Sequence, residues 1–426
     1  MKPNIIELVV KENRCIGCGA CVSICPVNVL SMDFNSSGLY EPKEISGCLK
    51  KCSLCLKVCP FYEKDQYEDI LSKELFYGLE YKQHIGYFIN TYEFSKLNLN
   101  EKLCSASGGA GNYLLKKLLE LDLVDEILTV KPNDDPNKLF KFNVFKSEDE
   151  IDESRGSVYY PVSMDEVLEY VLKNDKRYAI TALPCFAKAI RLFQKNNHKA
   201  KNRIKFIVGL VCGQMKSKDF AQQIADETFK NKTLIKSVNF RKKIPHKTAY
   251  GFAFEFEDIN GDLSIDYRDK SAFKYWTSRA FTPLACNNCI DVFAKCADVT
   301  LMDAWLDEKI KDYSGHSLLI VRNKIFDEIL KNVDKNDVFC KKIDSDLVVK
   351  SQNGAIDEKN SFYFYDKQNI LNKKIVRIKK DIQKQSLKDK KMDEVKLKKL
   401  KKQLKLKARK DTFIYLFKKH ILRKKV

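Results

Sequence analysis

Eight of the fifteen cysteines form two short runs near the start of the chain. The first run holds Cys15, Cys18, Cys21 and Cys25, and the second holds Cys48, Cys52, Cys55 and Cys59. Neighbouring cysteines are separated by only two or three residues, and a proline follows the last cysteine of each run. This spacing is typical of iron–sulfur clusters, because a tight loop aims three thiolates at one cube while the fourth lies too far along the chain.

The pairing of the two runs follows from the same spacing, since in proteins with two such clusters the fourth cysteine of one run ligates the other cluster. We therefore expect one 4Fe-4S cluster on Cys15, Cys18, Cys21 and Cys59, and a second on Cys25, Cys48, Cys52 and Cys55. Cys48 fits the pattern least, because its gap to Cys52 is one residue longer than the matching gap in the first run. Two zinc sites are the alternative, but zinc knuckles use two cysteine pairs with a longer spacer between them.

The elements that must position these residues alternate between strands and helices after the cysteine runs. We expect a strand in "NIIELVV", a hairpin in "VLSMDFNSSGLYEP", and a linker helix within residues 66–84. "SASGGAGNYLLKKLLELDLV" predicts a glycine loop that opens an amphipathic helix. Further strands are expected in "RYAITALPC", "RIKFIVGLVCG", "ADVTLMDAW" and "SLLIVRN". This alternation favours an α/β body.

Composition and charge narrow the class of protein. No run of 18 apolar residues is present and no leader-like stretch precedes Cys15, so we expect a cytoplasmic chain. Cysteines in that compartment are reduced, which favours metal ligation over disulfides. The net charge is +20, but residues 372–426 hold 23 Lys+Arg against 5 Asp+Glu and account for +18 of it. A nucleic-acid role for the whole chain is therefore not favoured.

Seven stretches, in order between about residues 103 and 323, resemble the beta subunits of coenzyme F-420 hydrogenases and dehydrogenases. They are "SASGGAGNYLLKKLL", "RGSVYYPVS", "ITALPCFAKAIR", "FIVGLVCG", "VNFRKK", "CNNCIDVFAKCADVTLMDAW" and "GHSLLIVRN". The resemblance implies a flavin-binding α/β domain with an additional iron–sulfur cluster, and bacterial members often occur beside genes for surface polysaccharide synthesis. The family's Gly-Asp before the tryptophan is Met302-Asp303 here.

Two candidate sites follow in the body. For FAD we expect Ser105, Ser107, Gly108, Gly109, Arg155, Gly156 and Ser157 to contribute, because glycines allow close approach and a helix N-terminus favours anionic groups. An ordinary helix cap and a solvated loop arginine are the alternatives. For a third 4Fe-4S cluster we expect Cys286 and Cys289 as ligands, then Cys185 and Cys212, with Cys296 as the substitute. The alternative for Cys185 or Cys212 is packing, because a lone buried cysteine more often serves as a small hydrophobe. We assign Cys104 and Cys340 to packing, and His316 to a structural role.

The predicted architecture is α+β and α/β: a bacterial-type ferredoxin fold, a mixed α/β flavin-binding body and a C-terminal basic helix. The boundaries are 1–65 for the ferredoxin domain, 66–84 for a linker, 85–177 and 178–345 for the two parts of the body, and 372–426 for the tail. The predicted function is a flavin- and iron–sulfur-dependent oxidoreductase acting on an organic substrate or deazaflavin, with a ferredoxin or deazaflavin as electron donor. The alternatives are an electron-transfer subunit without its own substrate, and a binding protein that merely carries clusters.

The tail predicts a basic amphipathic helix, with Leu397, Leu400 and Leu404 at helical spacing. Such helices suit anionic membrane surfaces, which would place the chain at the inner face of a membrane. Nucleic acid, or a partner protein that covers the leucines, is the alternative.

Overall fold

The computed structural model describes residues 4–49, 51–62, 68–268 and 270–361. The predicted tail helix over 372–426 lies outside the described residues. In the part that is described, no helix is both long and apolar enough to cross a membrane.

The N-terminal segment is small and built around the two cysteine runs. Its elements are η1 (Ile6–Val10), α1 (Ala20–Ser23), β1 (Leu30–Phe34), β2 (Tyr40–Glu44) and α2 (Leu54–Lys57). The predicted hairpin is confirmed: β1 and β2 pair antiparallel from Leu30–Glu44 to Phe34–Tyr40. The Asn35 side chain closes its turn by accepting the Ser37 backbone N–H at 2.9 Å.

The strand predicted in "NIIELVV" is wrong, because this stretch forms η1, a π-type helix. Strand alternation would place Glu7 on the same face as Ile5 and Val9. The helix instead buries Ile5 and Val9 and leaves Glu7 to pair with Lys11 at 2.8 Å. Tertiary packing against the cysteine runs therefore decides this element.

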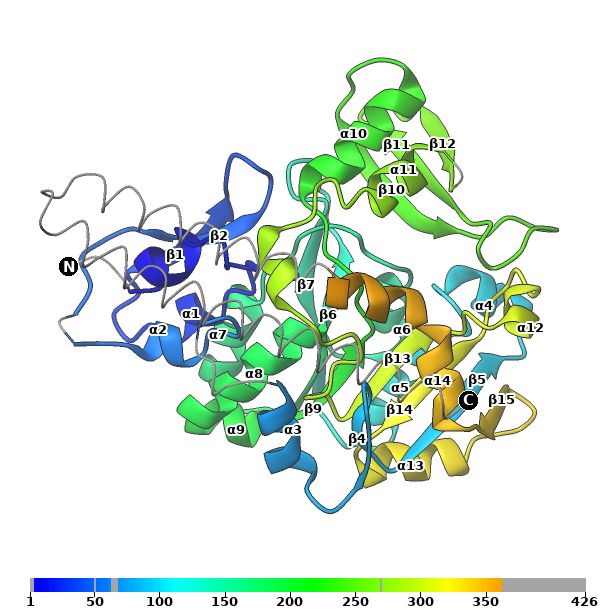
Figure 1. Ribbon diagram of the computed structural model, residues 1–426, viewed down its shortest axis with the longest axis horizontal. Coiled ribbons are helices and arrows are strands. Elements are labelled where there is room, and N and C mark those ends of the chain that lie inside the picture. Colours follow the sequence, from blue (N-terminus) through cyan, green and yellow to red (C-terminus); the bar gives the residue numbers. More distant parts are fainter. Residues whose placement is uncertain (1–3, 50, 63–67, 269, 362–426) are drawn as a thin grey trace, which may run out of the picture. The chain divides into compact units, whose positions relative to one another are not determined.

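The body contains one eight-stranded mixed sheet in the order β15-β5-β14-β13-β9-β8-β6-β7 (Figure 1). The strands are β5 (Asn90–Lys96), β6 (Glu126–Pro132), β7 (Phe140–Phe145), β8 (Tyr178–Ala182), β9 (Ile204–Leu210), β13 (Val299–Asp303), β14 (Ser317–Val321) and β15 (Val338–Lys342). The four central strands β13, β9, β8 and β6 are parallel, and antiparallel strands flank them on both sides. The α/β body is thus confirmed, and the carboxyl ends of four neighbouring strands meet at one edge.

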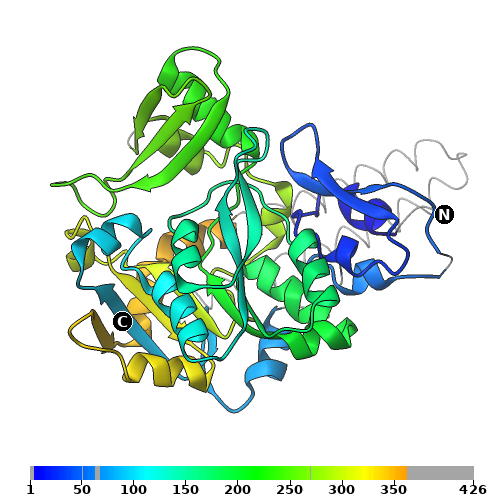
Figure 2. The ribbon, with the colours of Figure 1, turned by 180° about the vertical axis from the view of Figure 1, so that it is seen from behind.

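Helices cover both faces of this sheet, and Figure 2 shows it from behind. On one face α5 (Ala110–Glu120) and α13 (Lys324–Lys331) pack on buried side chains such as Phe94, Val208 and Leu319. On the other face lie α8 (Pro184–Asn196), over Ile180 and Ile207, and α14 (Ser345–Ser351), over Leu318. β8 and β14 are buried at every position, which explains why the body needs helices on both sides of the sheet.

The remaining elements of the body connect these layers. They are α3 (Glu68–Phe76), β3 (Glu80–Lys82), β4 (Gly86–Phe88), α4 (Leu99–Cys104), α6 (Glu148–Ile151), η3 (Asp152–Ser154), α7 (Asp165–Lys173), α9 (His198–Arg203), η4 (Leu284–Asn288) and α12 (Asp307–Ile310). The helix expected within residues 66–84 is present as α3. Residues 353–361 are also helical.

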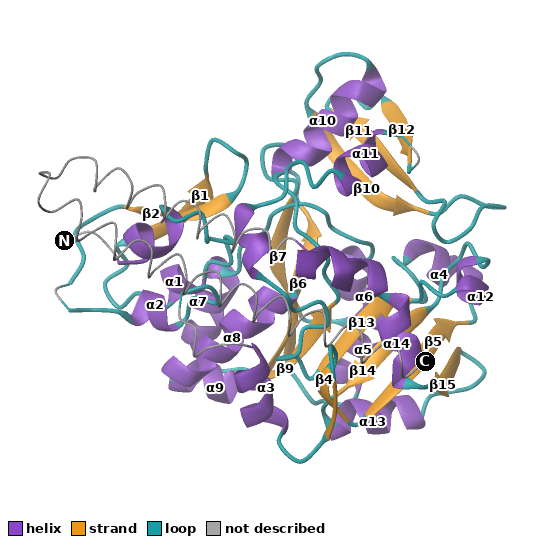
Figure 3. Ribbon diagram, in the orientation of Figure 1, coloured by secondary structure: helices purple, strands orange, loops and turns teal. Residues whose placement is uncertain are grey.

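A smaller layer follows β9 and was not predicted from the sequence. It comprises α10 (Lys218–Phe229), β10 (Ile235–Lys242), β11 (Ala253–Asp258), β12 (Leu263–Tyr267) and α11 (Ser271–Thr277). Its three strands form an antiparallel sheet of their own, separate from the main sheet in Figure 3. This layer supplies aromatic and cationic side chains to the site described below.

Candidate cofactor sites

The first set of predicted cluster ligands surrounds one small cavity. Cys15, Cys18, Cys21 and Cys59 all line a space of about 20 Å³, together with apolar side chains such as Ile5, Val9 and Val58. Cys59 belongs to the second run in sequence, so its presence here supports the predicted exchange of ligands between the runs.

The chemistry of this pocket suits a cluster. Burial raises the pKa of the Cys18 thiol to about 11 and that of Cys15 to about 12. Four buried thiols in an apolar pocket would stay neutral and inert on their own, whereas a bound metal deprotonates its thiol ligands. The residues present therefore fit a 4Fe-4S cluster.

The second set lies beside the N-terminus of η1. Burial raises the pKa of Cys55, and Cys52 and Cys48 raise it further by their proximity. The Asn4 side chain donates a hydrogen bond to the Cys52 carbonyl at 3.1 Å. Cys25 follows α1 and packs, partly buried, against the same core as Cys48. The assignment of these four cysteines to a second cluster remains a prediction.

Within the described ranges, no three His, Cys, Asp or Glu side chains converge closely enough to hold a single metal ion. A 4Fe-4S cube places its four thiolates on four different iron atoms, and they therefore lie farther apart than the ligands of one ion.

Four of the five candidate cysteines of the body lie together. Cys185 occupies the first turn of α8, Cys212 follows β9, and Cys286 and Cys289 lie in and just after η4. Burial raises the pKa of Cys185 well above its usual value, and Cys289, Cys212 and Cys286 all add to this effect. These four side chains fit a third cluster, and the positive N-terminal end of α8 suits an anionic group there.

Cys296 lies in a different environment. Its pKa is raised to about 12 by burial, and the neighbouring charges are those of Asp291, Glu68, Arg191 and Lys188. Its Sγ lies 3.8 Å from the Glu68 carbonyl oxygen at the start of α3. This placement supports Cys185, Cys212, Cys286 and Cys289 as the ligand set, with Cys296 in the packing between α3 and the body.

The two cysteines assigned to packing differ. Cys340 packs, partly buried, against the core beneath α5. Cys104 is exposed at the end of α4, and its assignment to packing is therefore wrong. The hydroxyl of the next residue, Ser105, donates to the Glu101 carbonyl at 2.9 Å and caps the end of that short helix.

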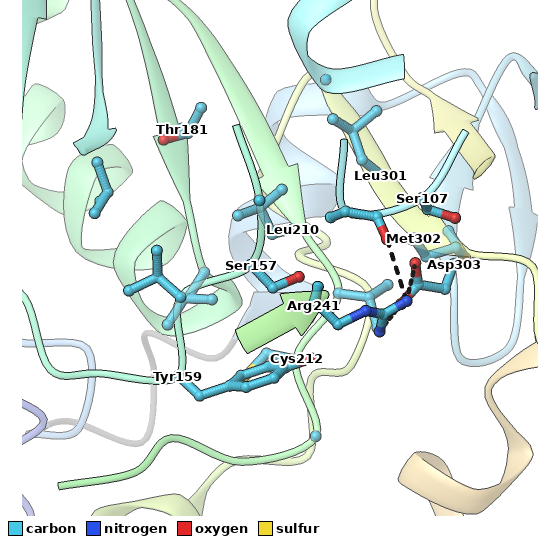
Figure 4. A pocket seen from close by; sticks show the side chains of 18 of the residues that line it. Ser107, Ser157, Tyr159, Thr181, Leu210, Cys212, Arg241, Leu301, Met302 and Asp303 are labelled. Atoms are coloured by element: carbon cyan, nitrogen blue, oxygen red, sulfur yellow. Dashed lines mark hydrogen bonds and ion pairs between the residues drawn. The ribbon is translucent and has the colours of Figure 1, made fainter. Parts of the chain in front are cut away.

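A cavity of about 620 Å³ lies at the carboxyl ends of the parallel strands (Figure 4). Thr181 and Leu183 from the end of β8, Leu210 and Cys212 after β9, and Asp303 at the end of β13 all line it. Ligands of open α/β sheets collect at this edge. Cys212 thus belongs both to this cavity and to the third cysteine set.

Most of the predicted flavin residues reach this cavity. Ser105, Ser107, Gly109, Gly156 and Ser157 line it, and the loop before α5 presents the N-terminus of that helix to it. Gly156 adopts φ +106°, and an added Cβ there would meet open space. A flavin with its phosphates fits the mixture of apolar walls and a helix N-terminus.

Gly108 and Arg155 have other roles. A Cβ on Gly108 would lie 2.5 Å from the Phe94 carbonyl oxygen and 2.7 Å from the Ser317 nitrogen, so this glycine lets the loop pack on β5 and β14. Arg155 forms an ion pair with Asp152 at 2.7 Å. Neither is among the residues that line the cavity.

Sequence reasoning missed the central cation of the cavity, Arg241 on β10. Its guanidinium is 6 % exposed, pairs with Asp303 at 3.1 Å and donates to the Ala106 carbonyl at 3.2 Å (Figure 4). It also stacks 4.2 Å from the centre of the Phe252 ring and 5.2 Å from that of Trp305. The stretch "VNFRKK" contains it, but Arg241 is followed there by two lysines, and nothing in the stretch marks the arginine as the buried residue.

Two buried lysines hold the loops around the cavity. Lys243 donates to the carbonyls of Lys102, Ser107 and Ser314, and burial lowers its pKa to about 7. Lys216 lines the cavity and donates to the Tyr275 and Ala280 carbonyls at 3.0 and 2.8 Å. Both fix the backbone around the cavity by donating to its carbonyl groups.

His316 fits the structural role assigned to it. Its carbonyl accepts the Ser107 hydroxyl at 2.6 Å, and its ring nitrogens lie about 3 Å from Glu93 and Asp312. The residue therefore anchors the glycine loop from the β14 side.

The fold and the paired sites together define an iron–sulfur protein with a ligand cavity on an α/β sheet. Two models of one family match the chain, and they describe the N-terminal and C-terminal parts of the beta subunit of coenzyme F-420 hydrogenase/dehydrogenase. The first matches residues 101–169 and the second matches residues 175–345. A "4Fe-4S binding domain" matches residues 8–31. The chain therefore belongs to the family of coenzyme F-420 hydrogenase/dehydrogenase beta subunits and carries an N-terminal 4Fe-4S segment.

Individual relatives are distant. The chain is 23% identical to one of the subunits of F(420)H(2) dehydrogenase from Methanosarcina mazei over 71% of this chain and 78% of that protein. It is 25% identical to the "Coenzyme F-420-dependent sulfite reductase" of Methanocaldococcus jannaschii over 48% of this chain, but spans only 31% of that protein. In fold it is similar to a chain of the F-420-reducing NiFe hydrogenase complex from Methanosarcina barkeri, with a TM-score of 0.51 and 19% identity over 66% of this chain and 94% of that chain.

Proposed function

We propose that this chain is an iron–sulfur flavoprotein oxidoreductase. Two 4Fe-4S clusters in the N-terminal segment and a third on Cys185, Cys212, Cys286 and Cys289 connect an electron donor with FAD in the large cavity. A bound flavin exchanges single electrons with clusters and a hydride with an organic substrate. The names of the relatives favour a deazaflavin as that substrate.

Cys212 carries this proposal, because it belongs to both sites. Its side chain is partly buried beside Cys286 and Cys289, and the residue lines the large cavity. Glu358 also lines the cavity and is the neighbour of Lys359, which contacts Cys289. A cluster and a flavin held by these residues would lie next to each other inside the protein.

The chain's own residues support flavin binding in three ways. The loop Ser105–Gly109 presents backbone and a helix N-terminus for phosphate. Tyr159, Phe254 and Trp276 supply an aromatic wall, with the Tyr159 and Trp276 ring centres 4.9 Å apart. Arg241 and Asp303 fix one side of the cavity as a buried ion pair.

An electron-transfer subunit without its own substrate is the second candidate. It is favoured by two similar proteins, one of which is a subunit of a dehydrogenase and the other a chain of a hydrogenase complex. In that case a partner enzyme would receive the electrons, and the cavity would hold a flavin that meets no free substrate. The association with polysaccharide synthesis stays a prediction.

The two candidates separate in one anaerobic experiment on the full chain. Reduced coenzyme F-420 is mixed with the purified protein, and flavin bleaching and the cluster EPR signals are followed. The proposal expects the flavin to bleach first and the clusters to be reduced afterwards. In a Cys212→Ala variant the flavin should still bleach, while cluster reduction slows by more than about tenfold. A bound flavin that fails to react with reduced F-420 or with any nicotinamide would favour the second candidate.

A further inference from the structure

Lys359 places a buried ammonium group against the third cysteine set. The residue is 3 % exposed, and its Nζ lies 3.3 Å from Cys289 Sγ and 2.6 Å from the Asp291 carbonyl oxygen. It comes from the helical residues 353–361, which lie beyond residue 345, where the family model ends. The contact therefore comes from residues that lie outside the region matched by the family model.

The other charges around the four cysteines have partners of their own. Arg279, near Cys286, pairs with Glu358 at 3.2 Å. Lys216, also near Cys286, is bound by the Tyr275 and Ala280 carbonyls. The Asp291 carboxylate accepts the Phe293 and Lys295 backbone N–H groups. Of these groups, Lys359 is the cation in direct contact with a cysteine sulfur.

We propose that Lys359 sets the reduction potential of the third cluster by supplying a fixed positive charge and an N–H donor to the Cys289 sulfur. This inference rests on the proposed function, since it assumes a cluster on Cys185, Cys212, Cys286 and Cys289. Reduction adds one electron to a group already made anionic by four thiolates, and no bond forms or breaks. A buried cation stabilises the reduced state more than the oxidised state, and charge and hydrogen bonds to sulfur are the levers that set such potentials.

A positive charge beside the third cluster affects where electrons collect in the protein. A higher potential makes the third cluster the preferred resting place for electrons among the three clusters. The cluster next to the cavity would then be the first of the three to hold an electron that it exchanges with the flavin. Lys359 is a positioning residue for electron transfer, because it acts on the cluster and does not touch the substrate.

The test is an EPR-monitored redox titration, with dithionite as reductant, of the anaerobically purified full chain and four variants. Lys359→Met should lower the equilibrium constant for reduction of the third cluster at least about tenfold, which is about 59 mV for one electron. Lys359→Arg, which keeps the charge, should change that constant less than about threefold. Lys350→Met removes an exposed lysine on the neighbouring helix α14 and should leave all potentials unchanged.

Three results would overturn the inference. An unshifted potential in Lys359→Met would show that the charge has no influence. The fourth variant, Lys359→Gln, keeps an N–H donor but removes the positive charge. A wild-type reduction potential in this variant would show that the hydrogen bond alone, and not the charge, sets the potential. Loss of the cluster in every Lys359 variant, with retention in Lys350→Met, would assign Lys359 a structural role. Failure of the underlying proposal looks different: the wild-type chain itself would hold only about eight iron atoms, as two clusters require.

Discussion

Gly108 offers a sharp test of how the glycine loop is built. In Gly108→Ala the new methyl group would lie 2.5 Å from the Phe94 carbonyl oxygen and 2.7 Å from the Ser317 nitrogen. Both are backbone atoms of paired strands and cannot rotate away. The loop would therefore have to move by roughly 1 Å to restore ordinary contact, and overpacking of this kind costs about 1–3 kcal/mol.

The displaced loop also carries the flavin site, because Ser107 and Gly109 line the cavity on either side of Gly108. A shift of about 1 Å in positioning groups can reduce a rate by about 100-fold. We expect Gly108→Ala to lose flavin during gel filtration and to unfold at lower urea concentration. The assay is a urea titration followed by tryptophan fluorescence, with flavin stoichiometry measured on the same samples.

Gly111→Ala is the matched control three residues away. Its added methyl group would meet only Leu301 Cδ1 at 3.4 Å, and alanine inside a helix such as α5 is favoured over glycine by about 0.5–1 kcal/mol. This variant should be as stable as the wild type or slightly more stable, and it serves as the control for stability alone because Gly111 itself lines the cavity. If Gly108→Ala matched Gly111→Ala in stability and kept its flavin, the packing argument for the loop would be wrong.

Three further predictions concern other parts of the chain. Arg241→Met should destabilise the protein by about 3–5 kcal/mol in urea titrations, because it leaves Asp303 without its buried partner, and the added substitution Asp303→Asn should recover part of that loss. Cys59→Ser should remove the EPR signal of the cluster held by the first run, whereas Cys25→Ser should affect the other N-terminal cluster; the opposite pattern would refute the exchange of ligands. Deletion of residues 372–426 should abolish co-sedimentation with anionic vesicles and leave the iron content unchanged, and continued sedimentation of the truncated chain would contradict the membrane prediction.

The apolar spacing and turn residues of short sequence stretches were enough to predict several helices and strands. The hairpin followed from alternation around Asn35 and Gly38, and the helix after the glycine loop followed from its apolar spacing. The strands that end at Ala182 and Leu210 were found because both are continuous apolar runs, as expected in a buried parallel sheet. Cysteine spacing predicted which thiols share the small N-terminal cavity.

The features that the sequence did not reveal depend on long-range contacts. Arg241 is one of three successive basic residues, and only its pairing with Asp303, 62 positions later, shows that it is the buried one. Nothing local marks Lys359 as buried, because it stands between the polar residues Glu358 and Asn360, and its role follows from the position of Cys289, 70 positions earlier. The helix η1 replaced a predicted strand because packing of Ile5 and Val9 outweighed local β preference.

The central claim is that one chain holds three 4Fe-4S clusters and a flavin beside the third. The most direct measurement is iron, acid-labile sulfide and flavin analysis of a single anaerobic preparation of the full chain. The proposal predicts about twelve iron atoms, about as many sulfide ions and about one FAD per chain. Iron and sulfide in these amounts without any flavin would contradict it.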